Sequence, residues 1–275
     1  MMKEVLHSLL PRLASLPGEV CVYGKDLTTG ETCAYQADLP VVAASVIKLP
    51  ILIEAFRQAE AGRLPMEETV AIRPEDKMPS CGALTYLHDG LTVTWRDLCV
   101  LMIILSDNTA TNLLIDRLSM DAVNDDTLRR LGCQKTVLRR RLFDAEASAR
   151  GIENTITASE MGMLLEKLYR GACVSTDADR AMLHILLDQR LNGKMPFFLH
   201  GDGVPVAHKT GEDDGITHDV GILLGERPMV LCFASEHTDV PAFERFIQDA
   251  ALAFCRGESI KNNCESIYGG IAAPN

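Results

Sequence analysis

Three short polar motifs lie far apart in this 275-residue chain and together could carry out acyl transfer through a serine ester. They are Ser45-Val46-Ile47-Lys48, Ser106-Asp107-Asn108 and Lys209-Thr210-Gly211. A serine hydroxyl is a poor nucleophile until a neighbouring base takes its proton. The first motif supplies a nucleophile and a base, and the other two supply a second hydroxyl, an amide and another ammonium group.

The spacing of Ser45 and Lys48 predicts that both side chains share one face of the first turn of a helix. Lysine acts as a base only when neutral, so its pKa must be lowered by burial or by a nearby cation. The apolar residues around Lys48 favour burial, and Lys209 is the candidate cation. The backbone N–H of Ser45, at a helix N-terminus, could stabilise an oxyanion.

The second motif follows an apolar run over residues 98–105 and is expected at the edge of a cleft. Ser106 could pass a proton to the leaving nitrogen. Asn108 could donate its amide to the substrate or contact Lys48. We expect Asp107 to be structural, as the N-cap of the next helix.

The third motif is expected at the end of a strand, followed by a turn over residues 211–215. Lys209 would attract a substrate carboxylate, and Thr210 would hydrogen-bond to it. Gly211 would let the substrate approach the backbone closely. The N–H of Glu212 would be the second oxyanion donor.

The elements that must position these motifs read as helix, two strands, a helical block, three strands and a closing helix. Antiparallel strands from both ends can join one sheet, covered by the terminal helices. We therefore expect an α/β (α+β) fold in which residues 1–38 and 190–256 form a sandwich domain. Residues 39–189 form an inserted all-α domain, and residues 257–275 a loose tail. A cleft between the two parts would hold the ligand.

Composition narrows the class of partner. The net charge of −11, with scattered acids, argues against nucleic acid, and no apolar run is long enough to span a membrane. Arg139-Arg140-Arg141 reads as a surface turn.

Nine cysteines without a C-x-x-C pair suggest free, mostly buried thiols and no metal site. We expect a monomer without a cofactor. Because residues 1–10 lack a signal-peptide core, the protein is expected in the cytosol, or exported if a signal was removed.

The three motifs, their order and the long helical insertion resemble the class A β-lactamase-like branch of the penicillin-recognising serine hydrolases. The resemblance covers residues 3–256. It implies the β-lactamase/transpeptidase-like fold, an acyl-enzyme at Ser45, and a small-molecule substrate with an acylated amide or ester and a carboxylate.

The sequence departs from that family at two points. The E-x-x-L-N loop pattern, whose Glu directs the hydrolytic water, is absent from residues 138–146, and by spacing its place falls at Arg141 or Leu142. Asp144 or Glu146 is the possible deacylation base, with Glu153 a further carboxylate. The Arg expected after the third motif is also missing, and Thr217-His218 stands nearby. His208 and His218 are the histidines nearest the expected cleft.

Three functions remain open at this point. The first is a β-lactamase that completes turnover. The second is a penicillin-binding, D-alanyl peptidase-like or esterase-like serine hydrolase, whose deacylation is slow because the loop Glu is absent. The third is a binding or sensor domain without catalysis, which the full set of nucleophile, base and hydroxyls argues against.

Overall fold

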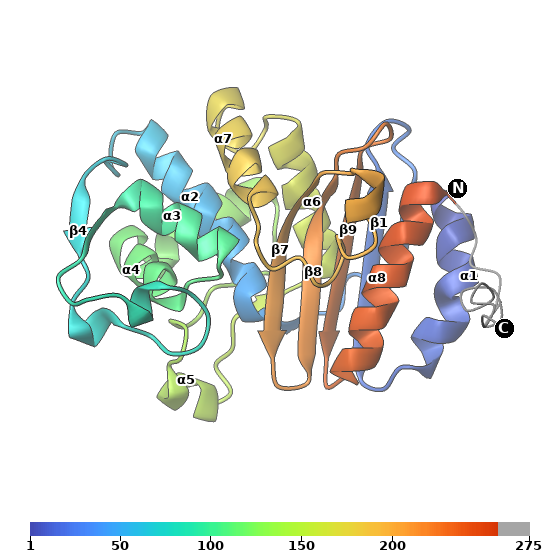
Figure 1. Cartoon of the computed structure of the whole chain (residues 1–275), viewed down its shortest axis with the longest axis horizontal. Helices are drawn as coiled ribbons and strands as arrows, with labels where there is room; N and C mark the ends of the chain where they lie inside the picture. Colours follow the sequence, from blue (N-terminus) through green and yellow to red (C-terminus); the bar gives the residue numbers. More distant parts are fainter. Residues whose placement is uncertain (258–275) are drawn as a thin grey trace, which may run out of the picture.

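A computed structural model describes residues 1–257, apart from the side chain of residue 126. The tail expected over residues 257–275 therefore lies outside the described residues, except for residue 257. The centre of the fold is a five-stranded antiparallel sheet in the order β2-β1-β9-β8-β7 (Figure 1). Its strands are β1 (Glu19–Asp26), β2 (Thr32–Tyr35), β7 (Val206–Asp213), β8 (Ile216–Leu223) and β9 (Met229–Glu236).

Strands from both ends of the chain pair in this sheet, as predicted. β1 pairs with β9 along its whole length, from Glu19 opposite Glu236 to Asp26 opposite Met229. This pairing brings two distant parts of the sequence into register. Because β7 lies at the edge of the sheet, only one of its two sides pairs with another strand.

The two faces of the sheet belong to two separate hydrophobic cores. Along β9, Leu231 and Phe233 pack with the terminal helices α1 (Met2–Ser15) and α8 (Val240–Arg256). The alternate residues Val230 and Cys232 belong to the core shared with the helical part. This follows from the two-residue period of a strand, and it explains why β8 is buried at every position.

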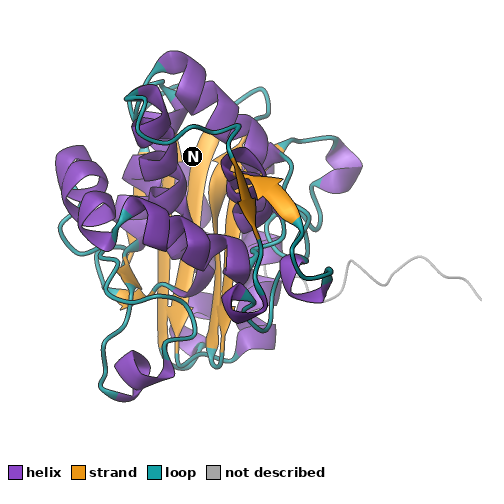
Figure 2. Ribbon diagram, turned by 90° about the vertical axis from the view of Figure 1, so that its left-hand side faces the viewer, coloured by secondary structure: helices purple, strands orange, loops and turns teal. Residues whose placement is uncertain are grey.

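The helical part covers the other face and extends beyond the β7 edge (Figures 1 and 2). Its α-helices are α2 (Lys48–Glu60), α3 (Trp95–Ile104), α4 (Asn108–Leu118), α5 (Ala145–Ala149), α6 (Ala158–Tyr169) and α7 (Thr176–Leu187). The label η marks helices of other types. The 3₁₀ helices are η1 (Ala44–Ile47), η2 (Pro74–Asp76), η3 (Leu84–Tyr86) and η5 (His200–Asp202), and η4 (Ala122–Arg129) is a π-helix. Two small sheets pair β3 (Val41–Val42) with β6 (Thr155–Ile156) and β4 (Thr69–Ala71) with β5 (Thr92–Thr94). Helix α6 packs directly on the sheet, and Gly162 lies against the ring of Tyr23.

Local sequence signals account for several helix ends. Thr94 caps α3 in a reciprocal capping box with Asp97, as predicted. Asp107 caps α4 through the N–H of Ala110, also as predicted. Two boundaries differ from expectation. The helix predicted over residues 45–61 begins as the 3₁₀ turn η1 before α2, and β7 runs on to Asp213, so the third motif lies inside a strand.

Two other features bear on the sequence-based expectations. Within residues 1–257, no helix is both long and apolar enough to cross a bilayer. The cysteines in the same part of the chain are free, and most are buried.

Candidate active site

The fold brings the three motifs together around one buried ammonium group, that of Lys48. Its Nζ donates to the carbonyl oxygen of Ser106 at 2.7 Å and to Asn108 Oδ1 at 2.8 Å, and it lies 3.0 Å from Ser106 Oγ. From the opposite side, Lys209 Nζ lies 3.1 Å from the same hydroxyl. The hydroxyl of Ser106, in the second motif, therefore lies between Lys48 of the first motif and Lys209 of the third.

Burial changes the proton affinity of both lysines. Lys48 and Lys209 are fully buried. Burial, and then the charge of Lys209, lowers the pKa of Lys48 well below its ordinary value. Burial, and then the charge of Lys194, lowers the pKa of Lys209 to about 7. The lowered pKa favours the neutral form of Lys48, which is the form that can accept a proton.

Ser45 lies at the N-terminal end of this arrangement, in η1, and is partly exposed. The preceding residue, Ala44, has φ of 41°, and Ser106 has φ of 53°. Both are uncommon conformations for residues other than glycine, and such strain gathers at functional sites. Sequence reasoning gave no sign of this strain, because neither position carries a glycine or asparagine.

Gly211 is needed for the approach of β7 to the Ser45 segment. A Cβ atom added at Gly211 would lie 2.9 Å from His218 Cδ2 and 3.2 Å from Val46 Cγ2. The absence of a side chain thus allows the third motif to pack directly against η1.

Asp107 organises the neighbouring loop over residues 81–84. Besides capping α4, its carboxylate accepts the backbone N–H groups of Ala83 and Leu84 at 2.7 and 2.9 Å. The N–H of Asn108 donates to the carbonyl of Cys81. These bonds hold residues 81–84 beside the second motif, which is the structural role expected for Asp107.

A pocket of about 540 Å³ opens beside Ser45. Its walls come from η1, from the loop beside α4, from the end of β7 and from the loop over residues 140–154. The lining includes Ser45, Asn108, Glu212, Asp213, Leu142, Phe143, Asp144 and Glu153. Ser45, Asn108 and Glu212 are thus brought to one cavity, with Lys48, Ser106 and Lys209 buried beneath its floor.

The loop that lacks the family glutamate is firmly held. Asn112, one turn beyond the second motif on α4, donates from Nδ2 to the carbonyl of Leu142 at 3.0 Å and accepts its N–H at 2.9 Å. Asn154 accepts the N–H groups of Arg139 and Arg140, and its carbonyl accepts the N–H of Ala43 near Ser45. Leu142 is therefore fixed at the wall of the pocket.

The candidate deacylation bases lie in different surroundings. Asp144 lines the pocket and caps α5 through the N–H of Ala147. Glu153 lines it too, but accepts from Arg140 Nε at 2.9 Å and from Ser148 Oγ. Glu146 lies in the first turn of α5, is exposed, and is absent from the lining.

The interpretation of one residue, Arg140, changes with the structure. Arg140 is not part of a solvated surface turn, because it pairs with Glu153 and lines the pocket. His218 Nε2 donates to the carbonyl of Val42 at 2.8 Å, while Nδ1 accepts the N–H of Ser235. Burial lowers the pKa of His218 to about 4, so it is a neutral structural group. His208 is buried against Asp219 and Asn192.

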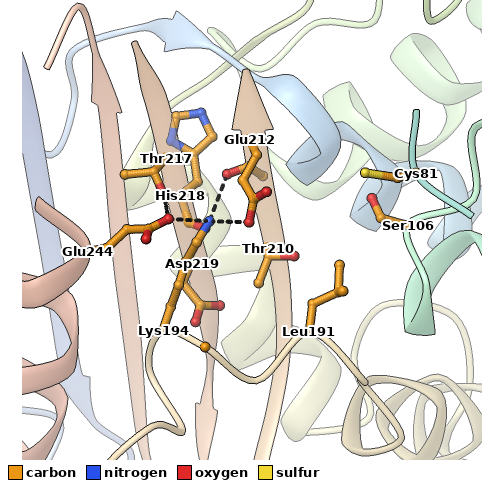
Figure 3. A network of polar contacts seen from close by, with 12 residues as sticks. Cys81, Ser106, Leu191, Lys194, Thr210, Glu212, Thr217, His218, Asp219 and Glu244 are labelled. Carbon is orange, nitrogen blue, oxygen red and sulfur yellow. Dashed lines mark hydrogen bonds and ion pairs between the residues drawn. The ribbon is translucent and has the colours of Figure 1, made fainter. Parts of the chain in front are cut away.

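Lys194 is a polar residue of this region that no motif indicated. Its side chain is 4% exposed and lies 3.0 Å from Glu212 Oε1 (Figure 3). The hydrogen-bonded contact between Asn112 and Leu142 was likewise not predicted from the sequence. Within residues 1–257, no three His, Cys, Asp or Glu side chains gather as metal ligands would.

Comparison with known proteins agrees with this geometry. The model of the β-lactamase enzyme family matches residues 2–255. A β-lactamase from Sphaerobacter thermophilus DSM 20745 is 31% identical, with a TM-score of 0.84 over 92% of this chain and 96% of that chain. A single-residue mutant of PBP-A, solved as an acyl-enzyme complex with penicillin-G, is 25% identical, with a TM-score of 0.82 over 92% and 95%.

An ancestral class A β-lactamase (GNCA) has the same fold, with 24% identity and a TM-score of 0.83 over 93% of this chain and 100% of that chain. The expected β-lactamase/transpeptidase-like fold is thereby confirmed. Because the family model spans almost the whole described chain, this protein belongs to the β-lactamase enzyme family and is a class A-like serine hydrolase.

Proposed function

We propose that the protein is a penicillin-recognising serine enzyme that forms an acyl-enzyme at Ser45 with a β-lactam or a related acylated amide, and that it releases the acyl group slowly. The observation that carries the proposal is the hydrogen-bonded series Lys48, Ser106 and Lys209 beneath the pocket that Ser45 lines. The family and the penicillin-G acyl-enzyme of the related PBP-A mutant agree with it.

Acylation follows from the protonation states. Ser45 Oγ attacks the carbonyl carbon while neutral Lys48 takes the hydroxyl proton. The N–H groups of Ser45 and Glu212 would stabilise the oxyanion. When the C–N bond breaks, the leaving nitrogen takes a proton from Ser106, and Ser106 regains one from Lys48. The products are an ester at Ser45 and a free amine. Lys209 and Thr210 would hold the substrate carboxylate.

Deacylation needs a water molecule activated beside the ester. By spacing, the glutamate that the family resemblance leads us to expect falls at Arg141 or Leu142, and neither side chain can serve as a general base. The carboxylate of Glu153 is occupied by Arg140. Loss of a general base typically slows a step by about 10²–10⁴-fold. We therefore favour slow release over efficient turnover.

An efficient β-lactamase is the second candidate, and Asp144 is the observation that favours it. Its carboxylate lines the pocket, and the β-lactamase from Sphaerobacter thermophilus is 31% identical to this chain. In this case Asp144 would activate the water for deacylation.

Intact-mass spectrometry with a chromogenic cephalosporin tests the proposal. We expect an adduct on the parent protein that persists for many minutes, and no adduct on Ser45→Ala. Colour should appear in a burst close to one equivalent, followed by a slow phase. A fast, continuous colour release would support the β-lactamase instead. An unmodified parent mass with several β-lactams and activated esters would contradict both candidates.

A further inference from the structure

Lys194 is a buried cation beside the site with no role in the acylation steps above. It rises from the loop after α7, and its Nζ donates to the carbonyl oxygens of Gly211 at 3.1 Å and His218 at 3.2 Å (Figure 3). These two residues are opposite each other on β7 and β8. A buried charge is costly unless it is paired, so the carboxylates around this ammonium group matter.

The carboxylate nearest to Lys194 is one that solvent can reach. Glu212 Oε1 lies 3.0 Å from Nζ, whereas Glu244 Oε1, from α8, is 3.8 Å away. The Glu212 side chain is 58% exposed and lines the pocket beside Ser45. An exposed carboxylate gains little from an ion pair, because water competes for it. Glu212 can therefore turn into solvent at small cost to its own charge, whereas the buried ammonium group then needs another anion in its place.

This ion pair lies where a substrate carboxylate is expected. Thr210 and Glu212 are two residues apart on β7, so their side chains lie on the same face of the strand. The charge of Lys194 also contributes to the low pKa of Lys209, so the two ammonium groups interact with each other. His218 is neutral and bonded on both ring nitrogens, and so cannot replace the family arginine.

We infer that Lys194 is the specificity-determining cation for a carboxylate-bearing substrate and that Glu212 occupies it in the free protein as an internal competitor. The inference rests on the proposed function. Binding then exchanges one carboxylate for another on the same ammonium group, and Glu212 turns toward solvent. The site should therefore favour anionic substrates over their neutral analogues by less than Lys194 alone would allow.

Benzylpenicillin and its methyl ester test this inference, because they share the acyl group and differ in the carboxylate. The measurement is the second-order acylation constant at Ser45 by mass spectrometry. Glu212→Gln removes the competitor, and we expect acylation by benzylpenicillin to rise about three- to fivefold relative to acylation by the methyl ester. Lys194→Met should lower acylation by benzylpenicillin about tenfold relative to acylation by the ester.

Asp214→Asn is the matched control, since it removes the charge of an exposed neighbour in the turn after β7 and should leave both constants unchanged. Equal effects of Glu212→Gln on both probes, or slower acylation by benzylpenicillin alone, would overturn the inference. A Lys194→Met variant whose acylation constants fall equally for both probes would also overturn the inference. Should Lys194→Met fail to fold, Glu212→Gln alone decides, because its side chain is exposed.

Failure of the proposed function would look different. If neither probe modifies Ser45 in the parent, the acyl-enzyme is wrong. The inference is then decided by equilibrium binding of benzylpenicillin to Ser45→Ala, by calorimetry. Glu212→Gln combined with Ser45→Ala should still bind benzylpenicillin more tightly than Ser45→Ala alone. An unchanged or weaker affinity would overturn the inference that Glu212 competes for Lys194.

Discussion

The two walls of the pocket differ in how their polar groups are used. On the wall built by η1, the α3–α4 junction and β7, Lys48 and Lys209 are buried and share the hydroxyl of Ser106. On the facing loop, the carboxylates have partners elsewhere. Asp144 caps α5, and Glu153 pairs with Arg140.

This difference separates the two halves of the reaction. A neutral lysine within a hydrogen-bonded series is prepared to accept a proton, which acylation requires. A carboxylate bonded to an arginine is a weak base, because the cation favours its ionised form. We therefore expect the protein to form an ester more readily than it hydrolyses one, and each of the following predictions tests one side of this contrast.

The largest effect is expected on the acylation wall. Lys48→Met keeps the length of the side chain and removes the base, so the acylation constant should fall by about 10²–10⁴-fold for any probe. Stopped-flow colour release combined with intact mass measures it. Lys3→Met, on the exposed face of α1, controls for the loss of a lysine. Acylation within a few-fold of the parent would mean that another group takes the proton.

A smaller effect is expected on the facing loop. Leu142→Glu places a carboxylate at a backbone position fixed by Asn112, and we expect it to speed deacylation by about 10²-fold with little change in acylation. The decay of the acyl-enzyme mass after removal of excess probe measures the rate. Leu142→Gln has the same shape without the charge and should not speed it.

The same decay measurement tests the remaining carboxylates. Asp144→Asn preserves the cap of α5, since asparagine caps as well as aspartate does, and should slow any residual deacylation. Glu146→Gln serves as its control, since that side chain does not line the pocket. If both variants decay like the parent, neither residue is the base and the water is activated from the Lys48 side.

The smallest effect concerns pH. With a pKa of about 7, Lys209 is charged below pH 7 and neutral above it. The ratio of the acylation constants for benzylpenicillin and its methyl ester should fall about tenfold as the pH rises from about 6 to about 8.5. Protonation of Lys48 changes the acylation constants of both probes by the same factor, so its effect cancels from the ratio. A ratio independent of pH would mean that Lys209 does not bind the carboxylate.

The parts that were predictable from the sequence depend on short-range rules. Thr94 with Asp97 indicated a helix start, and Asp107 indicated the next one. The alternation of residues 229–235 indicated a strand, although its two faces serve different cores. The three motifs indicated the residues that gather around Lys48, because their types suit one chemistry.

Other parts could not be predicted, because they depend on contacts between distant residues. No local pattern connects Asn112 with Leu142, which lie 30 positions apart and meet through two hydrogen bonds. Arg140 looked like part of a surface turn until the fold supplied Glu153 and a pocket. The length of β7 was underestimated because Glu212 and Asp213 are polar, although pairing with β8 continues through them.

By itself, the sequence determined which groups we propose for acyl transfer, because only certain side chains can act as nucleophile, base and hydroxyl bridge at these spacings. The tertiary structure alone decided how those groups are charged and which of them are available. Burial lowers the pKa of Lys48 and, together with the charge of Lys194, the pKa of Lys209, while Glu212 pairs with Lys194. Desolvation and pairing depend on what surrounds a side chain in space, and a linear sequence does not record those surroundings.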